Sequence, residues 1–196
     1  MDITTSRSSD PSRIRADALV VPVPSPPGDP EGPLAAVDAA LGGLVSQVIG
    51  DGEVTGALGQ VRVLHTRGDI PAARVLLTGM GEEPDRLAWG DAGRAAARAA
   101  RDAGAKKVAL LPAQGMDPGD VQAMAEGLAT GAWRLDGFRS RPRKDGKGPR
   151  DAREASVVVA GGGLSPTAAK AVGATADAVN LARELAETPS NHMTPT

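Results

Sequence analysis

The stretch that decides the fold is Ala18–Val23, which reads ALVVPV and is followed directly by PSPPGDP. A short apolar run that is rich in β-branched residues and ended by prolines predicts a buried strand followed by a loop. Three further runs have the same character, at 74–78 (RVLLT), 107–111 (KVALL) and 156–160 (SVVVA). Because these runs are apolar throughout instead of alternating, both faces of their sheet must be covered.

Helical spacing of apolar residues fills the segments between these strands. We expect helices at about 32–50, 85–103, 118–135 and 166–187, and a hairpin between the alternating run 60–66 and 74–78. Gly42 and Gly43 lie inside the apolar face of the first helix, where a close neighbouring backbone would explain them. The order of elements predicts an α/β fold, a three-layer αβα arrangement around a mostly parallel or mixed central sheet.

The composition excludes several classes of protein. The chain of 196 residues has no Cys, which excludes a disulfide framework and a thiol nucleophile. A net charge of −2 creates no global field that recruits nucleic acid or membranes. The opening MDITTSRSSDPSR is polar, and no apolar run approaches the roughly 20 residues needed to cross a bilayer. We therefore expect a cytoplasmic protein with neither a membrane nor nucleic acid as a partner.

Residues suited to catalysis are few. The only histidines, His65 and His192, lack the spacing of a metal-binding pair, and there is no Gly-x-Ser-x-Gly elbow or phosphate-binding P-loop. Asp117 and Asp120 stand at a helix start, where a carboxylate opposes the positive end of the helix dipole. The sequence predicts no catalytic residue, no metal ligand and no cofactor within this chain.

Two glycine clusters offer an alternative function. Gly161, Gly162 and Gly163 follow a strand and precede a helix, the position at which α/β sheets bind phosphate through backbone N–H groups. The cluster at 79–81 (GMG) has a similar place. A stand-alone module that binds ADP-ribose or another phosphate ligand is therefore one alternative.

A basic segment at 136–153 offers a second alternative. It has almost no apolar content and reads as an exposed loop, although clustered cations also contact phosphates in DNA. The candidate contact residues are Arg139, Arg141, Arg143, Lys144, Lys147 and Arg150.

The last predicted helix, at 166–187, is apolar over most of its circumference. Its polar residues form a narrow stripe, made of Gly173, Asp177, Asn180, Glu184 and Glu187. About 20 helical residues span about 30 Å, and a domain of this size covers one side of such a helix. The remaining apolar face predicts contact with another body of protein.

The end of this helix resembles a known family. The run Asn180-Leu-Ala-Arg-Glu-Leu185, then Thr188-Pro-Ser-Asn191 and Thr194-Pro195, is similar to the segment that joins the two domains of leucyl (cytosol) aminopeptidases. Glu184, Glu187 and Ser190 depart mildly from the family pattern, whereas EGLATGAWRLD at 126–136 supports it. The resemblance divides the chain into an α/β domain at 1–163 and a linker helix with its junction at 164–196. Its linker residues are Asn180, Arg183, Glu184, Pro189, Asn191, Thr194 and Pro195.

The resemblance implies a function for the longer protein. Family members are homo-hexameric metallo-aminopeptidases that release N-terminal amino acids with two divalent ions, Zn or Mn, held in a C-terminal catalytic domain. Their N-terminal domain has a fold akin to macro domains and contributes to assembly and active-site access. The family's metal-binding motifs, similar to Asp-x-Gly-Gly and Asn-Thr-Asp-Ala-Glu-Gly-Arg, do not occur in this sequence. The resemblance therefore implies a non-catalytic domain whose first partner is its own catalytic domain.

Overall fold

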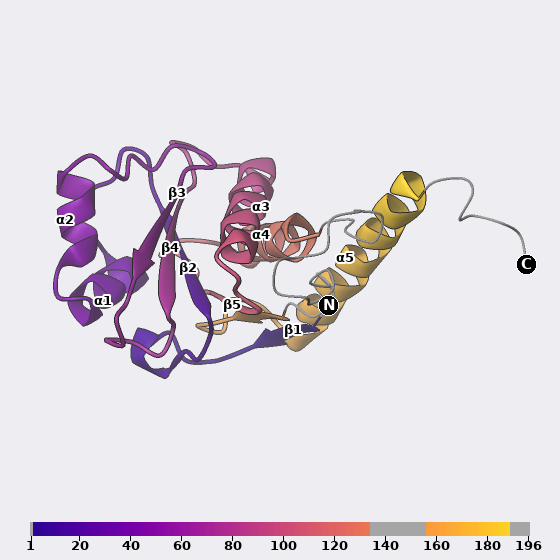
Figure 1. Cartoon of the computed structure of the whole chain (residues 1–196), viewed down its shortest axis with the longest axis horizontal. Helices are drawn as coiled ribbons and strands as arrows, with labels where there is room; N and C mark the ends of the chain where they lie inside the picture. The colour runs from indigo at the N-terminus through magenta and orange to yellow at the C-terminus, as the bar shows by residue number, and fades with distance from the viewer. Residues whose placement is uncertain (1, 134–155, 189–196) are drawn as a thin grey trace, which may run out of the picture.

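The computed structural model of the chain describes residues 2–133 and 156–188 (Figure 1). The strands are β1 (Asp2–Thr5), β2 (Ala18–Val23), β3 (Val61–His65), β4 (Arg74–Gly79), β5 (Lys107–Leu110) and β6 (Ser156–Val159). The α-helices are α1 (Gly32–Ala40), α2 (Leu44–Gly50), α3 (Arg86–Asp102), α4 (Pro118–Gly131) and α5 (Pro166–Glu187), and a short 3-10 helix, η1, covers Pro11–Arg13.

The described strands form one sheet in the order β1-β6-β5-β2-β4-β3. Neighbouring strands are parallel, except that β3 and β4 form an antiparallel hairpin. The central strand β2 pairs on both sides, with Leu19 opposite Val75 of β4 and Ala109 of β5. The predicted mostly parallel sheet and its hairpin are therefore confirmed.

Helices cover both faces of this sheet, as the apolar strands require. Helices α3, α4 and α5 pack on one face, and α1 and α2 pack on the other (Figure 1). All six residues of β2 are buried. Ala18 and Val20 belong to the first core, whereas Leu19 and Val21 belong to the second. The three-layer αβα arrangement follows from this alternation.

Helices α3 and α4 touch backbone to backbone. A Cβ added at Gly93 would lie 2.3 Å from the Met124 carbonyl oxygen, and one added at Gly127 would lie 2.2 Å from the Gly90 carbonyl oxygen. Real side-chain carbons do not approach so closely, so only glycine permits this crossing. Three small residues of α3 are also buried, at Ala96, Ala97 and Ala100.

The expected single helix at 32–50 is wrong. Gly42 and Gly43 have φ angles of +65° and +87°, and they separate α1 from α2, which are bent by 109°. No neighbouring atom lies within 4 Å of a Cβ placed at either glycine, so a close backbone does not explain them. Their left-handed conformation does, because glycine adopts it at little cost. The Asp38 carboxylate holds the bend by accepting hydrogen bonds from the Ser46 N–H and hydroxyl.

Among the described helices, none is alone both long and apolar enough to span a bilayer. The bent pair α1 and α2 passes a test of length and composition, and its apolar side chains lie in the second core.

Strand β1 was not expected from the sequence. It pairs with β6 at one edge of the sheet, with Ile3 opposite Val157 and half-buried against the first core. A strand of four residues that contains an Asp and two Thr shows no continuous apolar run. Its pairing depends on a partner about 150 residues away, which local patterns do not reveal.

Candidate interdomain junction

Helix α5 is the element on which the described linker residues lie. It begins at Ser165, whose side chain accepts a hydrogen bond from the Ala168 N–H at 3.1 Å, and Pro166 occupies the first turn. Its first half packs into the domain through Ala169, Val172 and Ala176. The second half continues beyond the sheet, as the yellow end of the helix in Figure 1 shows. The helix therefore has an anchored half and a projecting half.

Arg183 fastens the projecting half to the end of α4. Its guanidinium donates a hydrogen bond to the Thr130 carbonyl oxygen at 2.8 Å and lies 5.9 Å from the centre of the Trp133 ring. A cation is favourable there, because the last carbonyls of a helix lack intrahelical partners and carry the negative end of its dipole. Stacking on the indole adds a cation–π contribution.

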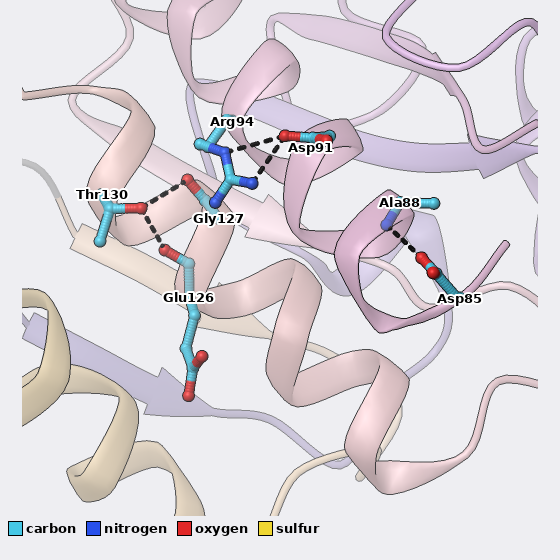
Figure 2. A network of polar contacts seen from close by, with 7 residues as sticks. All are labelled: Asp85, Ala88, Asp91, Arg94, Glu126, Gly127 and Thr130. Carbon is cyan, nitrogen blue, oxygen red and sulfur yellow. Dashed lines mark hydrogen bonds and ion pairs between the residues drawn. The ribbon is translucent and has the colours of Figure 1, made fainter.

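The receiving end of α4 is held by its own hydrogen bonds. The Thr130 hydroxyl donates to the Glu126 carbonyl oxygen at 2.8 Å, and Figure 2 shows it reaching back between the carbonyls of Glu126 and Gly127. Thr130 is buried, so this hydroxyl needs an internal acceptor. On the facing helix α3, Arg94 pairs with Asp91 at 2.6 Å (Figure 2). Arg183 therefore docks on a residue, Thr130, whose own side chain is held by hydrogen bonds within α4.

Two other linker residues lie on the side of α5 near the domain. The Asn180 Oδ1 atom is buried and accepts no hydrogen bond from any residue that the structure describes. The Glu184 carbonyl oxygen accepts hydrogen bonds from the Thr188 N–H and hydroxyl, at 2.9 and 2.6 Å, which ends the helix. The predicted polar stripe therefore does not simply face water, since Gly173 is buried and Asn180 and Glu184 are half-buried.

The opposite side of α5 is apolar and exposed. Leu181 and Leu185 are 56% and 50% exposed, and Ala178 and Ala182 beside them are also exposed. The domain therefore covers one side of the helix and leaves the other side exposed. Contact of this exposed side with another body of protein stays a prediction.

The remaining linker residues, Pro189, Asn191, Thr194 and Pro195, lie outside the described ranges. So do His192 and the six candidate residues of the basic segment, from Arg139 to Arg150.

Most backbone donors of the candidate phosphate loops are engaged, at Gly161 and Gly162 of the first cluster and at all three residues of the second. The N–H groups of Gly161 and Gly162 donate to the carbonyl oxygens of Ser8 and Ser6, both at 3.0 Å. In the second cluster, the N–H groups of residues 79, 80 and 81 donate to the carbonyls of Gln60, Val23 and Gly56. A phosphate would have to displace these bonds, so the geometry does not favour this alternative.

The carboxylates at helix starts act as caps, as expected. Asp117 accepts hydrogen bonds from the N–H groups of Gly119 and Asp120, and the Asp120 carboxylate accepts one from the Asp117 N–H. The Asp120 N–H is the main cause that lowers the pKa of the Asp117 carboxyl, and the Gly119 N–H and the charge of Arg86 act in the same direction. Asp85 caps α3 in the same way, through the Ala88 N–H (Figure 2).

A catalytic arrangement does not emerge from the described residues. Across 2–133 and 156–188, no group of three or more His, Cys, Asp or Glu side chains is placed to hold a metal ion. His65 is exposed at the edge of the sheet, opposite Arg74. Sequence reasoning missed the roles of Thr130 and Trp133, which receive Arg183 from 50 or more residues away.

Known proteins resemble the chain in sequence and in fold. The family model of the N-terminal domain of the cytosol aminopeptidase family matches residues 20–142. A probable cytosol aminopeptidase of Geotalea uraniireducens is 36% identical over an aligned length of 170, and the alignment covers 81% of this chain and 33% of that protein. The chain thus spans about a third of this relative's length.

Solved structures show the same fold. A mutant of tomato leucine aminopeptidase matches with a TM-score of 0.75 and 23% identity, covering 100% of this chain and 40% of that one. The macrodomain of Mycobacterium tuberculosis DarG matches with a TM-score of 0.57 and 15% identity, covering 81% and 96%. The sheet is therefore of the macrodomain type. The chain belongs to the cytosol aminopeptidase family, and the part that matches is that family's N-terminal domain.

Proposed function

We propose that this chain is the non-catalytic N-terminal domain of a metal-dependent leucyl aminopeptidase, which releases N-terminal amino acids from peptides in the cytoplasm. Its role is architectural: it carries the catalytic domain on α5 and contributes to assembly of a homo-hexamer and to active-site access. The observation that carries this proposal is the two-sided α5. One side is bound to the domain by Arg183 and the core, and the other exposes Leu181 and Leu185.

The metal chemistry belongs to the rest of the protein. The described residues do not fit a centre with two divalent ions, because no cluster of suitable ligands lies among them. We therefore assign the two ions, Zn or Mn, to the C-terminal catalytic domain and derive no catalytic step from this domain.

The two alternatives have less support. Likeness to macrodomains at 15% identity shows the fold alone, and the N–H groups of Gly161 and Gly162, which would help to hold ADP-ribose, donate to backbone carbonyls instead. The proposed DNA contacts lie outside the described residues. Calorimetry with ADP-ribose tests the first alternative, and the salt dependence of DNA binding tests the second.

Hydrolysis of an N-terminal leucine amide tests the main proposal. The 196-residue chain, supplied with Mn²⁺ or Zn²⁺, is expected to give no turnover, whereas the full-length protein that contains this domain is expected to be active. Turnover by the isolated chain contradicts the non-catalytic role. An inactive full-length protein, loaded with either metal, contradicts the assignment as an aminopeptidase.

A further inference from the structure

The exposed side of α5 has a regular pattern of its own. Five apolar residues that are all exposed follow at spacings of three, four, three and four; they are Ala171, Ala174, Ala178, Leu181 and Leu185. We name this set the outer seam. A repeat of three and four residues places all its members on one narrow stripe of a helix.

The outer seam lies opposite the anchored side. At 3.6 residues per turn, its centre is turned by roughly 180° from the buried set of Ala169, Val172 and Ala176. An α-helix that is apolar on two opposite sides can pack against a different part of a protein on each side. On one side of α5, the packing partners are α4 and β1 of this domain.

The spacing of the outer seam fits a helix as its partner. Apolar residues at alternating steps of three and four form the seam of two packed helices, whereas a helix that covers a sheet needs a broader apolar band. Ala182 and Ala186 are exposed on one flank of the seam but have small side chains, so the larger exposed apolar side chains of α5 lie on the seam itself. Ala171, Ala174 and Ala178 carry small side chains, so a partner helix can come close there. Leu181 and Leu185 supply larger side chains further along.

We infer that the outer seam is the docking surface for a helix of the polypeptide that follows α5 in the full-length protein. This inference rests on the proposed function. The matched part of the Geotalea relative corresponds to the N-terminal domain, and about two-thirds of that relative's sequence lies outside the match. A segment tethered to the end of α5 has an effective concentration in the millimolar range, which a second copy of the chain lacks.

Arg183 and the outer seam act from different sides of the same helix. The contacts of Arg183 with Thr130 and Trp133 fix the rotation of α5 about its own axis. The stripe that the partner helix meets is therefore oriented before docking, which reduces the entropy lost on association.

Single cysteines test this inference cleanly, because the chain has no Cys of its own. Ala174→Cys and Ala178→Cys place a thiol in the outer seam, and Ala186→Cys places one on an exposed flank of the same helix. Rates of maleimide labelling are compared between the full-length protein and the 196-residue chain. In the full-length protein, we expect the two seam thiols to react at least about tenfold more slowly than in the isolated chain, and the flank thiol to react equally in both.

Three other results would overturn the inference. Equal labelling rates of the seam thiols in both proteins would show that nothing covers the outer seam in the full-length protein. Slow labelling in the isolated chain that depends on protein concentration assigns the seam to a second copy. Protection that also includes Ala186→Cys indicates a broad surface instead of a helix. Leucine amide hydrolysis, measured on the unmodified full-length protein, separates a failure of this inference from a failure of the proposed function.

Discussion

The crossing of α3 and α4 allows a sharp test at Gly93. In Gly93→Ala, the added Cβ would lie 2.3 Å from the Met124 carbonyl oxygen and 3.0 Å from the Leu128 nitrogen. Both are backbone atoms, so relief requires the two helices to separate by about 1 Å. Overpacking of this kind costs about 1–3 kcal/mol, and alanine in a helix recovers about 1 kcal/mol. Because no flexible side chain can move aside, we take the upper end of the overpacking cost. We therefore expect the free energy of unfolding to fall by about 2 kcal/mol.

Gly90 provides the matched control, one turn earlier on the same helix and equally buried. There the nearest atom to an added Cβ is a nitrogen of the flexible Arg94 side chain, at 3.5 Å. Gly90→Ala is therefore expected to leave stability unchanged or to raise it by up to about 1 kcal/mol.

Thermal unfolding followed by circular dichroism measures both variants. A domain of this size shifts its Tm by about 2–4 °C per kcal/mol, so Gly93→Ala should lower Tm by about 4–8 °C while Gly90→Ala does not lower it. Urea unfolding should show the same order with an unchanged slope. If the two variants unfold at the same temperature, the reasoning from backbone contact is refuted.

Three further predictions follow from other described contacts. Arg183→Met should lower the free energy of unfolding by about 1 kcal/mol and alter the emission of Trp133, whereas unchanged emission would contradict their stacking. Gly43→Ala should destabilise by about 1 kcal/mol or more because its φ is +87°, whereas Gly50→Ala, which has open space around it and an ordinary φ, should not; equal urea midpoints would contradict this. The pKa of the Asp117 carboxyl is lowered in the folded state, so its charge stabilises above the unfolded pKa of about 3.9 and stops doing so as the pH falls through the folded value. The Tm difference between wild type and Asp117→Asn should therefore be constant near neutral pH and shrink below about pH 4, and a difference independent of pH would contradict the assignment.

Much of the fold could be predicted from the sequence, because the apolar runs of the central strands indicate strands without ambiguity. Ala18–Val23 is apolar at every position and is buried on both faces, so its pattern predicted the layers around it. The bounds of α5, Pro166–Glu187, agree with the helix expected at about 166–187. The break at Gly42 and Gly43 was missed because the apolar spacing continues across it. Glycine is tolerated both in a helix and in a turn, so its presence alone does not show whether the helix continues. The φ angle, known from the structure, shows that it breaks.

The junction was predictable as a motif but not as a contact. The run from Asn180 to Leu185 indicated a linker, and the composition of α5 indicated two covered sides. The docking of Arg183 on Thr130 joins residues 53 positions apart. Local propensity and periodicity contain no information about such a pair. The same is true of the buried Asn180 Oδ1 atom, which has no hydrogen-bond donor among the described residues.

Strand β1 has a consequence for synthesis of the protein. Among the described strands it pairs with β6 alone, and Asp2 lies opposite Ser156, so β1 leaves the ribosome about 150 residues ahead of its partner strand. At 5–20 residues per second, it waits for about 8–30 seconds. A waiting strand that was long and apolar would invite pairing with other chains. The Asp and Thr residues of β1 explain why its sequence did not predict a strand. The same polar residues reduce the pairing of β1 with other chains before β6 is synthesised.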